Sequence, residues 1–258
     1  MDLGITGRTA LVTGAGRGLG ASVAMRLAHE GVRILGVTRS QFSLDKLLER
    51  LDGDRTHAGL AIDLEDPKAV DAAITWALSQ DPTIDIVINN VGGNLGIDDP
   101  LASEDDFMKV LHINVGVAIE INRAMIPGMR DRQWGRICHI SSIASLENQG
   151  TPAYCAAKAA LNAYVRSVGR FTSPDNVILN GILPGAVMTK GGYWDVAQQD
   201  RPEHVNRYLQ ERMAIQRFGT EAEIADAVAF LVSDNASFLV GSMLLADGGQ
   251  GRVFFEQE

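Results

Sequence analysis

The sequence has few cysteines, few aromatic residues and no long apolar run. Its two cysteines, Cys138 and Cys155, lie in an apolar strand-like run and in an Ala-rich helical segment. This placement predicts neither a disulfide framework nor a metal site. No stretch approaches the roughly 18 apolar residues of a membrane-spanning helix, and residues 1–9 lack the basic and apolar regions of a targeting signal. These absences predict a cytoplasmic protein in a reducing compartment, with no membrane partner and no catalytic metal.

An excess of positive charge is also lacking. The chain has 23 Lys and Arg residues against 32 Asp and Glu residues, which gives a formal net charge of -9. Because nucleic acids and anionic membranes attract basic surfaces, this balance argues against a nucleic-acid or membrane partner. The acidity mainly indicates solubility.

The pattern of apolar residues predicts one α/β domain over residues 1–258. With 258 residues, 46% of them hydrophobic, the chain can bury a full core, and no repeat or linker divides it. Short β-type runs alternate with helical patterns, as in βαβ units. The runs are Thr9–Val12, Val32–Val37, Thr56–Ile62, Ile84–Ile88, Arg136–Ile140, Val177–Ile182 and Met243–Leu245. We expect a Rossmann-like, doubly wound sheet of seven mostly parallel strands, with helices on both faces.

Two segments of this pattern are candidates for binding. Residues 189–219 interrupt the alternation and are expected to form a substrate-binding lid over the carboxyl edge of the sheet. The first strand leads directly into a glycine cluster that includes Gly14, Gly18 and Gly20. In a strand-turn-helix context, glycines allow a pyrophosphate to approach backbone N–H groups at the helix N-terminus. The alternative is a tight turn without chemical use.

The end of the second strand indicates which dinucleotide would bind. NAD-binding units place an acidic residue there, whereas this chain has Thr38, Arg39 and Ser40. Arg17, inside the glycine turn, is predicted to reach the same ribose, and two guanidinium groups suit a 2′-phosphate. We therefore expect NADP(H) rather than NAD(H). The alternative is that both arginines are solvated surface residues.

Tyr154 and Lys158 lie four residues apart in an Ala-rich helical segment, so both side chains project from one face. A free tyrosine titrates near pH ~10, and a neighbouring ammonium group favours the phenolate. The pair therefore predicts a tyrosine with a lowered pKa that transfers protons near neutrality. The alternative is a solvated helix face.

Together these motifs resemble the short-chain dehydrogenase/reductase family in its classical type, over nearly the whole chain, and are similar to its 3-oxoacyl-acyl-carrier-protein reductases. Asn89–Gly92 resembles the family's Asn-Asn-Ala-Gly motif, with Val91 in place of Ala. Asp247–Gly249 resembles the family's ending of the last strand. The resemblance implies cofactor contacts for Gly14, Arg17, Gly18, Leu19, Gly20, Arg39, Asp63, Leu64, Asn90, Gly92, Tyr154, Lys158, Pro184, Gly185, Val187 and Thr189.

The resemblance also implies a catalytic serine, which falls on Ser141 or on Ser142. Counting back from Tyr154 favours Ser141, whereas reading forward from the strand that ends at Ile140 favours Ser142. We prefer Ser142, because strand alternation is rigid while the following loop can lose a residue at little cost.

By the same resemblance, the protein is an NADP(H)-dependent oxidoreductase acting on a carbonyl or secondary alcohol. Ser142 would donate to the carbonyl oxygen and Tyr154 would deliver a proton. Lys158 would hold the nicotinamide ribose, and Asn114 would position a water. One alternative is an NAD-dependent sugar or alcohol dehydrogenase. Another is a catalytically silent nucleotide-sensing scaffold, which has no physical need for all four residues.

The substrate and partners remain open between several classes. Substrate contacts are expected from residues 94–95, 143–149, 187–194 and 202–213, which suit 3-oxoacyl groups, sugars or small ketones. A basic run is predicted either to dock an acidic acyl-carrier protein or to be a solvated rim. It comprises Arg123, Arg130, Arg132 and Arg136. The family implies a homotetramer packed through the helices that contain Asn114 and Tyr154. His112 and His139 are expected to pack rather than to catalyse.

Overall fold

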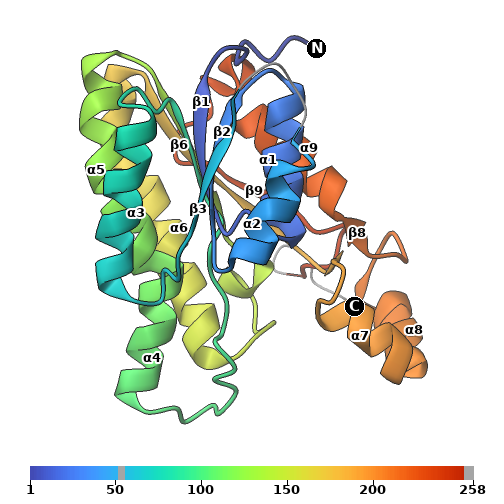
Figure 1. Ribbon diagram of the computed structural model, residues 1–258. Helices are drawn as coiled ribbons and strands as arrows, with labels where there is room; N and C mark the ends of the chain where they lie inside the picture. The colour runs from blue at the N-terminus through green and yellow to red at the C-terminus, as the bar shows by residue number, and fades with distance from the viewer. Residues whose placement is uncertain (52–55, 253–258) are drawn as a thin grey trace.

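The computed structural model describes residues 1–51 and 56–252. The predicted domain, 1–258, also includes residues 52–55 and 253–258, which lie outside the described residues. The centre of the molecule is a seven-stranded sheet in the order β3-β2-β1-β4-β5-β6-β9 (Figure 1). Every pair of neighbours in this sheet is parallel. The predicted Rossmann-like fold is therefore confirmed.

All seven predicted strands are present, with ends that differ by at most two residues from the predicted ones. The strands of the main sheet are β1 Thr9–Thr13, β2 Arg33–Thr38, β3 Ala58–Ala61, β4 Ile86–Asn89, β5 Gly135–Ile140, β6 Val177–Pro184 and β9 Met243–Ala246. Two further strands, β7 Val187–Met188 and β8 Gly219–Thr220, pair with each other in a separate parallel ladder that the sequence pattern does not predict.

The helices alternate with the strands. They are α1 Gly18–His29, α2 Gln41–Leu48, α3 Pro67–Gln80, α4 Glu104–Leu111, α5 Val117–Asp131, α6 Pro152–Thr172, α7 Tyr193–Asp200, α8 Pro202–Arg212 and α9 Glu221–Leu231. A π-helical turn, His112–Gly116, joins α4 to α5, and short 3-10 turns occur at Ile143–Ser145, Ser173–Asp175 and Asp234–Ala236. Local chemistry fixes several helix starts. For example, Thr220 and Glu223 form a capping box at the start of α9.

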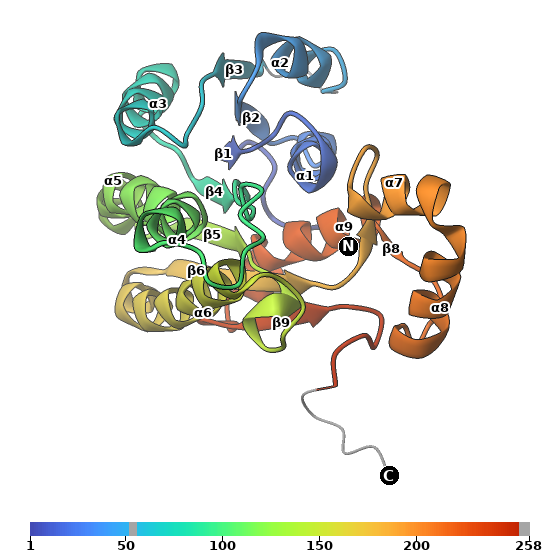
Figure 2. The same cartoon turned by 90° about the horizontal axis from the view of Figure 1, so that it is seen from below.

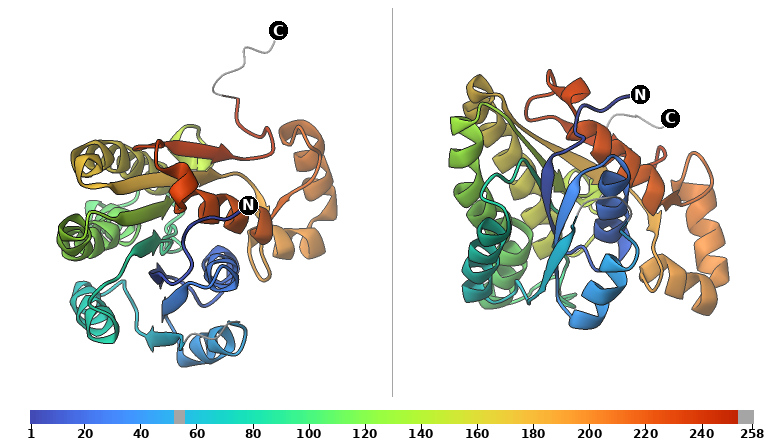
Figure 3. Two further views of the ribbon diagram at one scale, coloured as in Figure 1. Left: turned by 90° about the horizontal axis from the view of Figure 1, so that it is seen from above. Right: turned by 45° about the horizontal axis from the view of Figure 1, so that its top comes forward.

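Two apolar layers cover the sheet because alternate strand residues point to opposite faces. On one face, Val12 and Ile88 belong to a cluster with the apolar sides of α1 and α9. On the other, Leu11 and Val87 belong to a cluster with α3, α5 and α6. Seen from above, the two groups of helices lie on either side of the strands (Figure 3).

The strand order reverses between β1 and β4, which are neighbours although β2 and β3 lie between them in the chain. In open parallel sheets, such a reversal opens a crevice at the carboxyl ends of the strands, where ligands bind. Residues 193–212 form α7 and α8, which stand apart from the layered helices (Figure 2). Their own small cluster includes Ala197, Val205 and Phe218.

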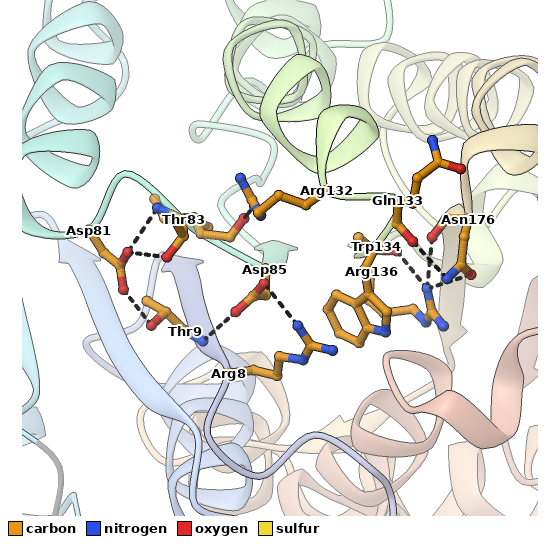
Figure 4. Close-up of polar contacts among 12 residues, drawn as sticks. Arg8, Thr9, Asp81, Thr83, Asp85, Arg132, Gln133, Trp134, Arg136 and Asn176 are labelled. Carbon is orange, nitrogen blue, oxygen red and sulfur yellow. Dashed lines mark hydrogen bonds and ion pairs between the residues drawn. The ribbon is translucent and has the colours of Figure 1, made fainter.

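The predicted basic docking run is wrong for Arg136. This side chain is only 2% exposed and pairs with Asp234 at 3.1 Å. It lies at the start of β5, the amino end of the sheet, where Arg8 and Arg136 place their guanidinium carbons 3.7 Å and 4.6 Å from the centroid of the Trp134 ring (Figure 4). An arginine that packs against an aromatic ring inside the fold cannot offer its charge to a partner.

The other three arginines of the run form ion pairs or hydrogen bonds within the chain. Arg123 pairs with Glu120 at 2.6 Å and Arg130 pairs with Asp175 at 2.5 Å. Arg132 donates to the carbonyl of Ile84 at 2.7 Å. Within residues 1–51 and 56–252, no helix is long and apolar enough to cross a membrane.

Candidate active site

The turn between β1 and α1 brings backbone N–H groups to the carboxyl edge of the sheet. Gly14 and Gly18 have φ angles of 64° and 59°, a region that glycine adopts without strain. A Cβ on Gly20 would lie 2.2 Å from the carbonyl oxygen of Gly14, so only glycine fits there. A Cβ on Gly18, in contrast, would meet nothing within 4 Å. The turn is therefore closed toward the protein and open toward the crevice.

Asn90 holds this turn in place. Its Nδ2 donates to the carbonyl oxygens of Thr13 at 2.9 Å and Gly14 at 3.1 Å. The Thr13 hydroxyl in turn accepts from the backbone N–H groups of Asn90 and Val91. Asn90 thus joins the end of β4 to the glycine turn. Sequence reasoning missed Thr13, whose only signal is its position at the end of the first strand.

A cavity of about 700 Å³ follows the carboxyl ends of β1, β2, β3 and β4. It is lined by many of the residues predicted to contact a cofactor: Gly14, Arg17, Gly18, Leu19, Gly20, Arg39, Asp63, Leu64, Asn90, Gly92 and Thr189. It is also lined by Lys190, which belongs to the predicted lid, and by residues that sequence reasoning missed, among them Ser40, Ser43, Glu65 and Ile113. Most of these follow a predicted strand, which is the signal that could have found them.

Arg39 lies at one end of this cavity, just beyond β2. Its guanidinium is 3.8 Å from the carboxylate of Glu65, and the two side chains are 69% and 45% exposed. An ion pair this long and exposed is weak, so Arg39 is able to exchange Glu65 for an anionic ligand. Arg17, at the N-cap of α1, is also exposed beside the cavity.

Tyr154 and Lys158 occupy successive turns of α6, as their spacing predicts. Lys158 is 3% exposed and donates from Nζ to the carbonyl of Ile140 at 2.9 Å. Burial lowers the pKa of Lys158 to about 8.

The predicted lowering of the Tyr154 pKa is wrong for this structure. Burial raises the pKa of Tyr154, while a hydrogen bond with Ser142 acts in the opposite direction. Lys158 Nζ lies 5.6 Å from the centroid of the Tyr154 ring and is turned toward Ile140, so desolvation of the phenol prevails.

The two neighbouring serines face different surroundings. Ser142 is half-buried, its hydroxyl accepts from the N–H of Ala144 at 3.1 Å, and it lies near enough to Tyr154 to act on the pKa of that phenol. Ser141 is 4% exposed and donates to Asn162 Oδ1 at 2.6 Å. Alternation along the strand therefore points Ser142, but not Ser141, toward the tyrosine.

Asn114 lies inside the π-helical turn between α4 and α5, which the sequence pattern does not reveal. Its Nδ2 donates to the carbonyls of Gly93 at 2.7 Å and Val110 at 2.8 Å, and its Oδ1 accepts from the N–H of Gly93. A Cβ on Gly92 would lie 2.6 Å from Asn114 Oδ1 and 3.2 Å from Lys158 Nζ. Gly92 therefore leaves the gap through which the asparagine and the lysine approach each other.

A second cavity, of about 400 Å³, lies between Ser142 and the helices α7 and α8. Its lining combines aromatic rings with polar groups: Ser142, Ile143, Gln149, Gly185, Ala186, Tyr193, Trp194, His204, Tyr208 and Gln250. Of the predicted cofactor residues, Gly185 lines this cavity instead of the larger one, Pro184 is buried in β6, and Val187 pairs in β7. Gln250, which sequence reasoning missed, accepts from the N–H of Ala186 and donates to the Tyr208 hydroxyl.

The two histidines differ in burial. His139 is fully buried beside the side-chain amides of Asn89 and Asn122, and burial lowers its pKa to about 4. It therefore stays neutral at physiological pH. His112 begins the π-helical turn and is half-buried.

In the described part of the chain, no group of three or more His, Cys, Asp or Glu residues could hold a metal ion.

The chain as a whole is similar to known proteins. A family model described as enoyl-(acyl carrier protein) reductase matches residues 14–250. A 3-oxoacyl-[acyl-carrier-protein] reductase of Pseudomonas aeruginosa is 30% identical over 251 residues, which cover 96% of this chain and 98% of that protein. The oxidoreductase UcpA of Escherichia coli is 33% identical over 255 residues and covers 95% of each chain. The chain belongs to the short-chain dehydrogenase/reductase family.

Solved structures of short-chain dehydrogenases/reductases extend the likeness to the whole fold. A 3-oxoacyl reductase from Agrobacterium tumefaciens with NADP bound superimposes with a TM-score of 0.89 at 32% identity, covering 96% of each chain. L-sorbose reductase from Gluconobacter frateurii, complexed with NADPH and L-sorbose, gives 0.90 at 28% identity, covering 99% of this chain and 100% of that one. As a short-chain dehydrogenase/reductase, this chain is an oxidoreductase.

Proposed function

We propose that this protein is an NADP(H)-dependent oxidoreductase that transfers a hydride between nicotinamide and the carbonyl or secondary alcohol of a small substrate. The observation that carries the proposal is the placement of Ser142 beside Tyr154, whose pKa the serine acts to lower, with buried Lys158 one helical turn away. In a reductase, a polarised carbonyl needs a hydrogen-bond donor and a proton donor at one point, and these two hydroxyls supply both.

The larger cavity fits a dinucleotide. The open space beside Gly18 and the exposed N–H groups of the turn suit a pyrophosphate, and Asp63 and Leu64 line the end expected for adenine. Arg17 and Arg39 suit a 2′-phosphate. Two structural neighbours contain NADP or NADPH, which supports the same choice here, although another neighbour, a 7α-hydroxysteroid dehydrogenase, is complexed with NADH.

The chemistry follows from the roles of the side chains. When bound, nicotinamide supplies a hydride for reduction and accepts one for oxidation. Ser142 donates to the carbonyl oxygen and Tyr154 transfers its proton to that oxygen as negative charge develops. Lys158 holds the ribose hydroxyls and supplies positive charge, and Asn114 places a water on the path to Lys158. Oxidation of the alcohol uses the same groups in reverse.

The smaller cavity supports a hydroxylated or 3-oxoacyl substrate. Gln149, His204 and Tyr208 offer polar groups, whereas Trp194 and Tyr193 form an aromatic wall. The names of several relatives favour a 3-oxoacyl thioester carried by an acyl-carrier protein. A ketose is supported by the L-sorbose reductase neighbour and by the polar lining.

We also propose that the protein works as a homotetramer. Four small residues on α6 are exposed, Ala156, Ala159, Ala160 and Ala163, and permit close packing against a helix of another copy. Light scattering of the purified protein measures the mass. A monomer at micromolar concentration would contradict this part of the proposal.

The first experiment is a fluorescence titration of NADPH and NADH against the wild type, Arg39→Asp and the matched control Arg50→Asp. We expect the wild type and the control to prefer NADPH by about tenfold or more, roughly 1.4 kcal/mol, and Arg39→Asp to lose the preference. Equal affinities in the wild type would favour an NAD-dependent alcohol dehydrogenase. Binding of neither nucleotide would refute the proposal.

Turnover is then measured with acetoacetyl-CoA, L-sorbose and cyclohexanone. We expect the wild type to reduce at least one of them and Tyr154→Phe to bind NADPH without turnover. If the wild type binds NADPH but reduces none of these or a wider carbonyl panel, the silent nucleotide-sensing scaffold becomes the better account.

A further inference from the structure

A buried chain of hydrogen bonds runs from Ser141 to the backbone of Ser142. The Ser141 hydroxyl donates to Asn162 Oδ1 at 2.6 Å, and Asn162 Nδ2 donates to Ser145 Oγ at 2.7 Å. The Ser145 hydroxyl then donates to the carbonyl of Ser142 at 2.6 Å. Ser141 and Asn162 are 4% and 3% exposed, so water does not compete for the bond between them, whereas Ser145 is half-buried.

Asn162 therefore forms hydrogen bonds with the polypeptide on both sides of Ser142. Before Ser142 it holds the side chain of Ser141, and after Ser142 it holds Ser145, which closes the 3-10 turn Ile143–Ser145. The N–H of Ser145 also donates to the carbonyl of Ser142 at 3.0 Å. The direction of each bond follows from the Ser142 carbonyl, which can only accept: Ser145 donates to it, so Ser145 Oγ accepts from Asn162 Nδ2, and Asn162 Oδ1 accepts from Ser141.

The position of Asn162 on α6 adds to this geometry. Tyr154, Lys158 and Asn162 are spaced by four residues, so they form one stripe along the helix. Asn162 is the member of this stripe that bonds to Ser141 and Ser145, the residues on either side of Ser142. It thus connects the element that holds the tyrosine to the element that holds the serine.

We propose that Asn162 is a positioning residue, which orients the Ser142 hydroxyl toward Tyr154 by fixing the backbone on either side of Ser142. This inference rests on the proposed function, in which both hydroxyls act on a carbonyl oxygen. Misplacement of a catalytic group by about 1 Å can lower a rate by roughly 100-fold, so a remote amide is able to control turnover. Asn162 does not line the cofactor cavity, and its effect is separate from nucleotide binding.

The test compares Asn162→Ala and Ser145→Ala with the wild type and with Thr172→Val. Thr172 lies on the same helix, is 1% exposed and donates to the carbonyl of Val177 at 2.8 Å. Thr172→Val therefore removes a buried hydrogen bond of α6 far from Ser142. We expect Asn162→Ala to lower kcat about tenfold or more and Ser145→Ala to lower it several-fold. Both should keep the NADPH dissociation constant within about twofold of the wild-type value.

A pH profile separates positioning from mere stability. Ser142 acts to lower the pKa of Tyr154 against the larger effect of burial, and the other close charged or titratable neighbours of Tyr154 are Cys155 and Lys158. In the oxidation direction Tyr154 is the base, so kcat falls below its pKa; this pKa should move upward in Asn162→Ala and Ser145→Ala, as it should in Ser142→Ala. Thr172→Val should show a lower melting temperature with an unchanged profile.

The outcomes are distinct. A wild type without turnover would overturn the proposed function and this inference together. If the wild type is active and Asn162→Ala matches Thr172→Val in kcat and pH profile, only the positioning role is overturned. If Asn162→Ala fails to fold, Ser145→Ala decides, because Ser145 is half-buried and its loss leaves the Ser141–Asn162 bond in place.

Discussion

Lys158 Nζ donates to the carbonyl oxygen of Ile140 at 2.9 Å and thereby joins α6 to the last residue of β5. The lysine is buried, and burial lowers its pKa to about 8. The protein thus keeps a desolvated ammonium at the point where the catalytic strand and the catalytic helix meet. Burying this charge lowers the stability of the folded state, and a role of the lysine in catalysis would explain why the protein retains it.

The first prediction follows from that cost. Because the folded pKa of Lys158 lies below its unfolded value, the unfolded state binds more protons between about pH 8 and pH 10.5, and stability rises with pH there. At pH 7, Lys158→Met should raise the free energy of unfolding by roughly 1–2 kcal/mol, since the desolvation penalty is removed and one hydrogen bond is lost. Urea denaturation measures this gain, which should shrink at pH 9.5 while turnover is lost at both pH values. A variant less stable than the wild type at both pH values would contradict the account.

The second prediction concerns the amino end of the sheet, where Arg136 is buried against Trp134 and Asp234. Burial lowers the pKa of Arg136, and the charge of Asp234 opposes this shift. Arg136→Ala should destabilise the fold by about 2–4 kcal/mol, because it removes packing and leaves buried acceptors unpaired. The control Arg123→Ala removes an exposed pair with Glu120 and should leave the urea midpoint unchanged. Equal midpoints for the two variants would contradict the burial argument.

The main sheet could be predicted because each strand is a nearly continuous apolar run between helical patterns, as in Ile86–Asn89. The small β7–β8 ladder could not, because two-residue strands have no periodicity. The π-helical turn His112–Gly116 also escaped prediction, since its widened turn lies within an uninterrupted helical pattern. Arg136 was misplaced because its partner Asp234 is distant in sequence and only the fold brings them together.

The candidate site also has features that the sequence predicts and features that it does not. Tyr154 and Lys158 could be found because one helix carries both at a fixed spacing. The Ser141–Asn162–Ser145 chain could not, because it depends on the packing of α6 against the end of β5. The direction of the Tyr154 pKa depends on burial, which a local sequence pattern does not reveal.

The third prediction concerns Glu65, which lies 3.8 Å from Arg39 and lines the cofactor cavity. Its carboxylate competes with a 2′-phosphate for Arg39 and repels that phosphate. Glu65→Gln should therefore tighten NADPH binding about two- to threefold at low ionic strength, leave NADH binding unchanged, and lose its effect in high salt. Fluorescence titration measures both nucleotides, with Glu49→Gln as a control of equal charge change outside the cavity lining. An equal increase in affinity for NADPH and NADH would show that Glu65 acts through its general electrostatic effect on the cavity instead of through Arg39.

The fourth prediction separates two glycines of the same turn. At Gly18, which has a φ of 59°, an added methyl group would enter open space. Gly18→Ala should cost only about 1 kcal/mol of stability from backbone strain, yet weaken nucleotide binding tenfold or more by filling the space for the pyrophosphate. At Gly20, the methyl group would lie 2.2 Å from the carbonyl of Gly14, so Gly20→Ala should unfold at clearly lower urea concentration. Urea denaturation and NADPH titration of both variants distinguish the roles. If Gly18→Ala binds NADPH like the wild type, the open side of the turn is not where the pyrophosphate lies.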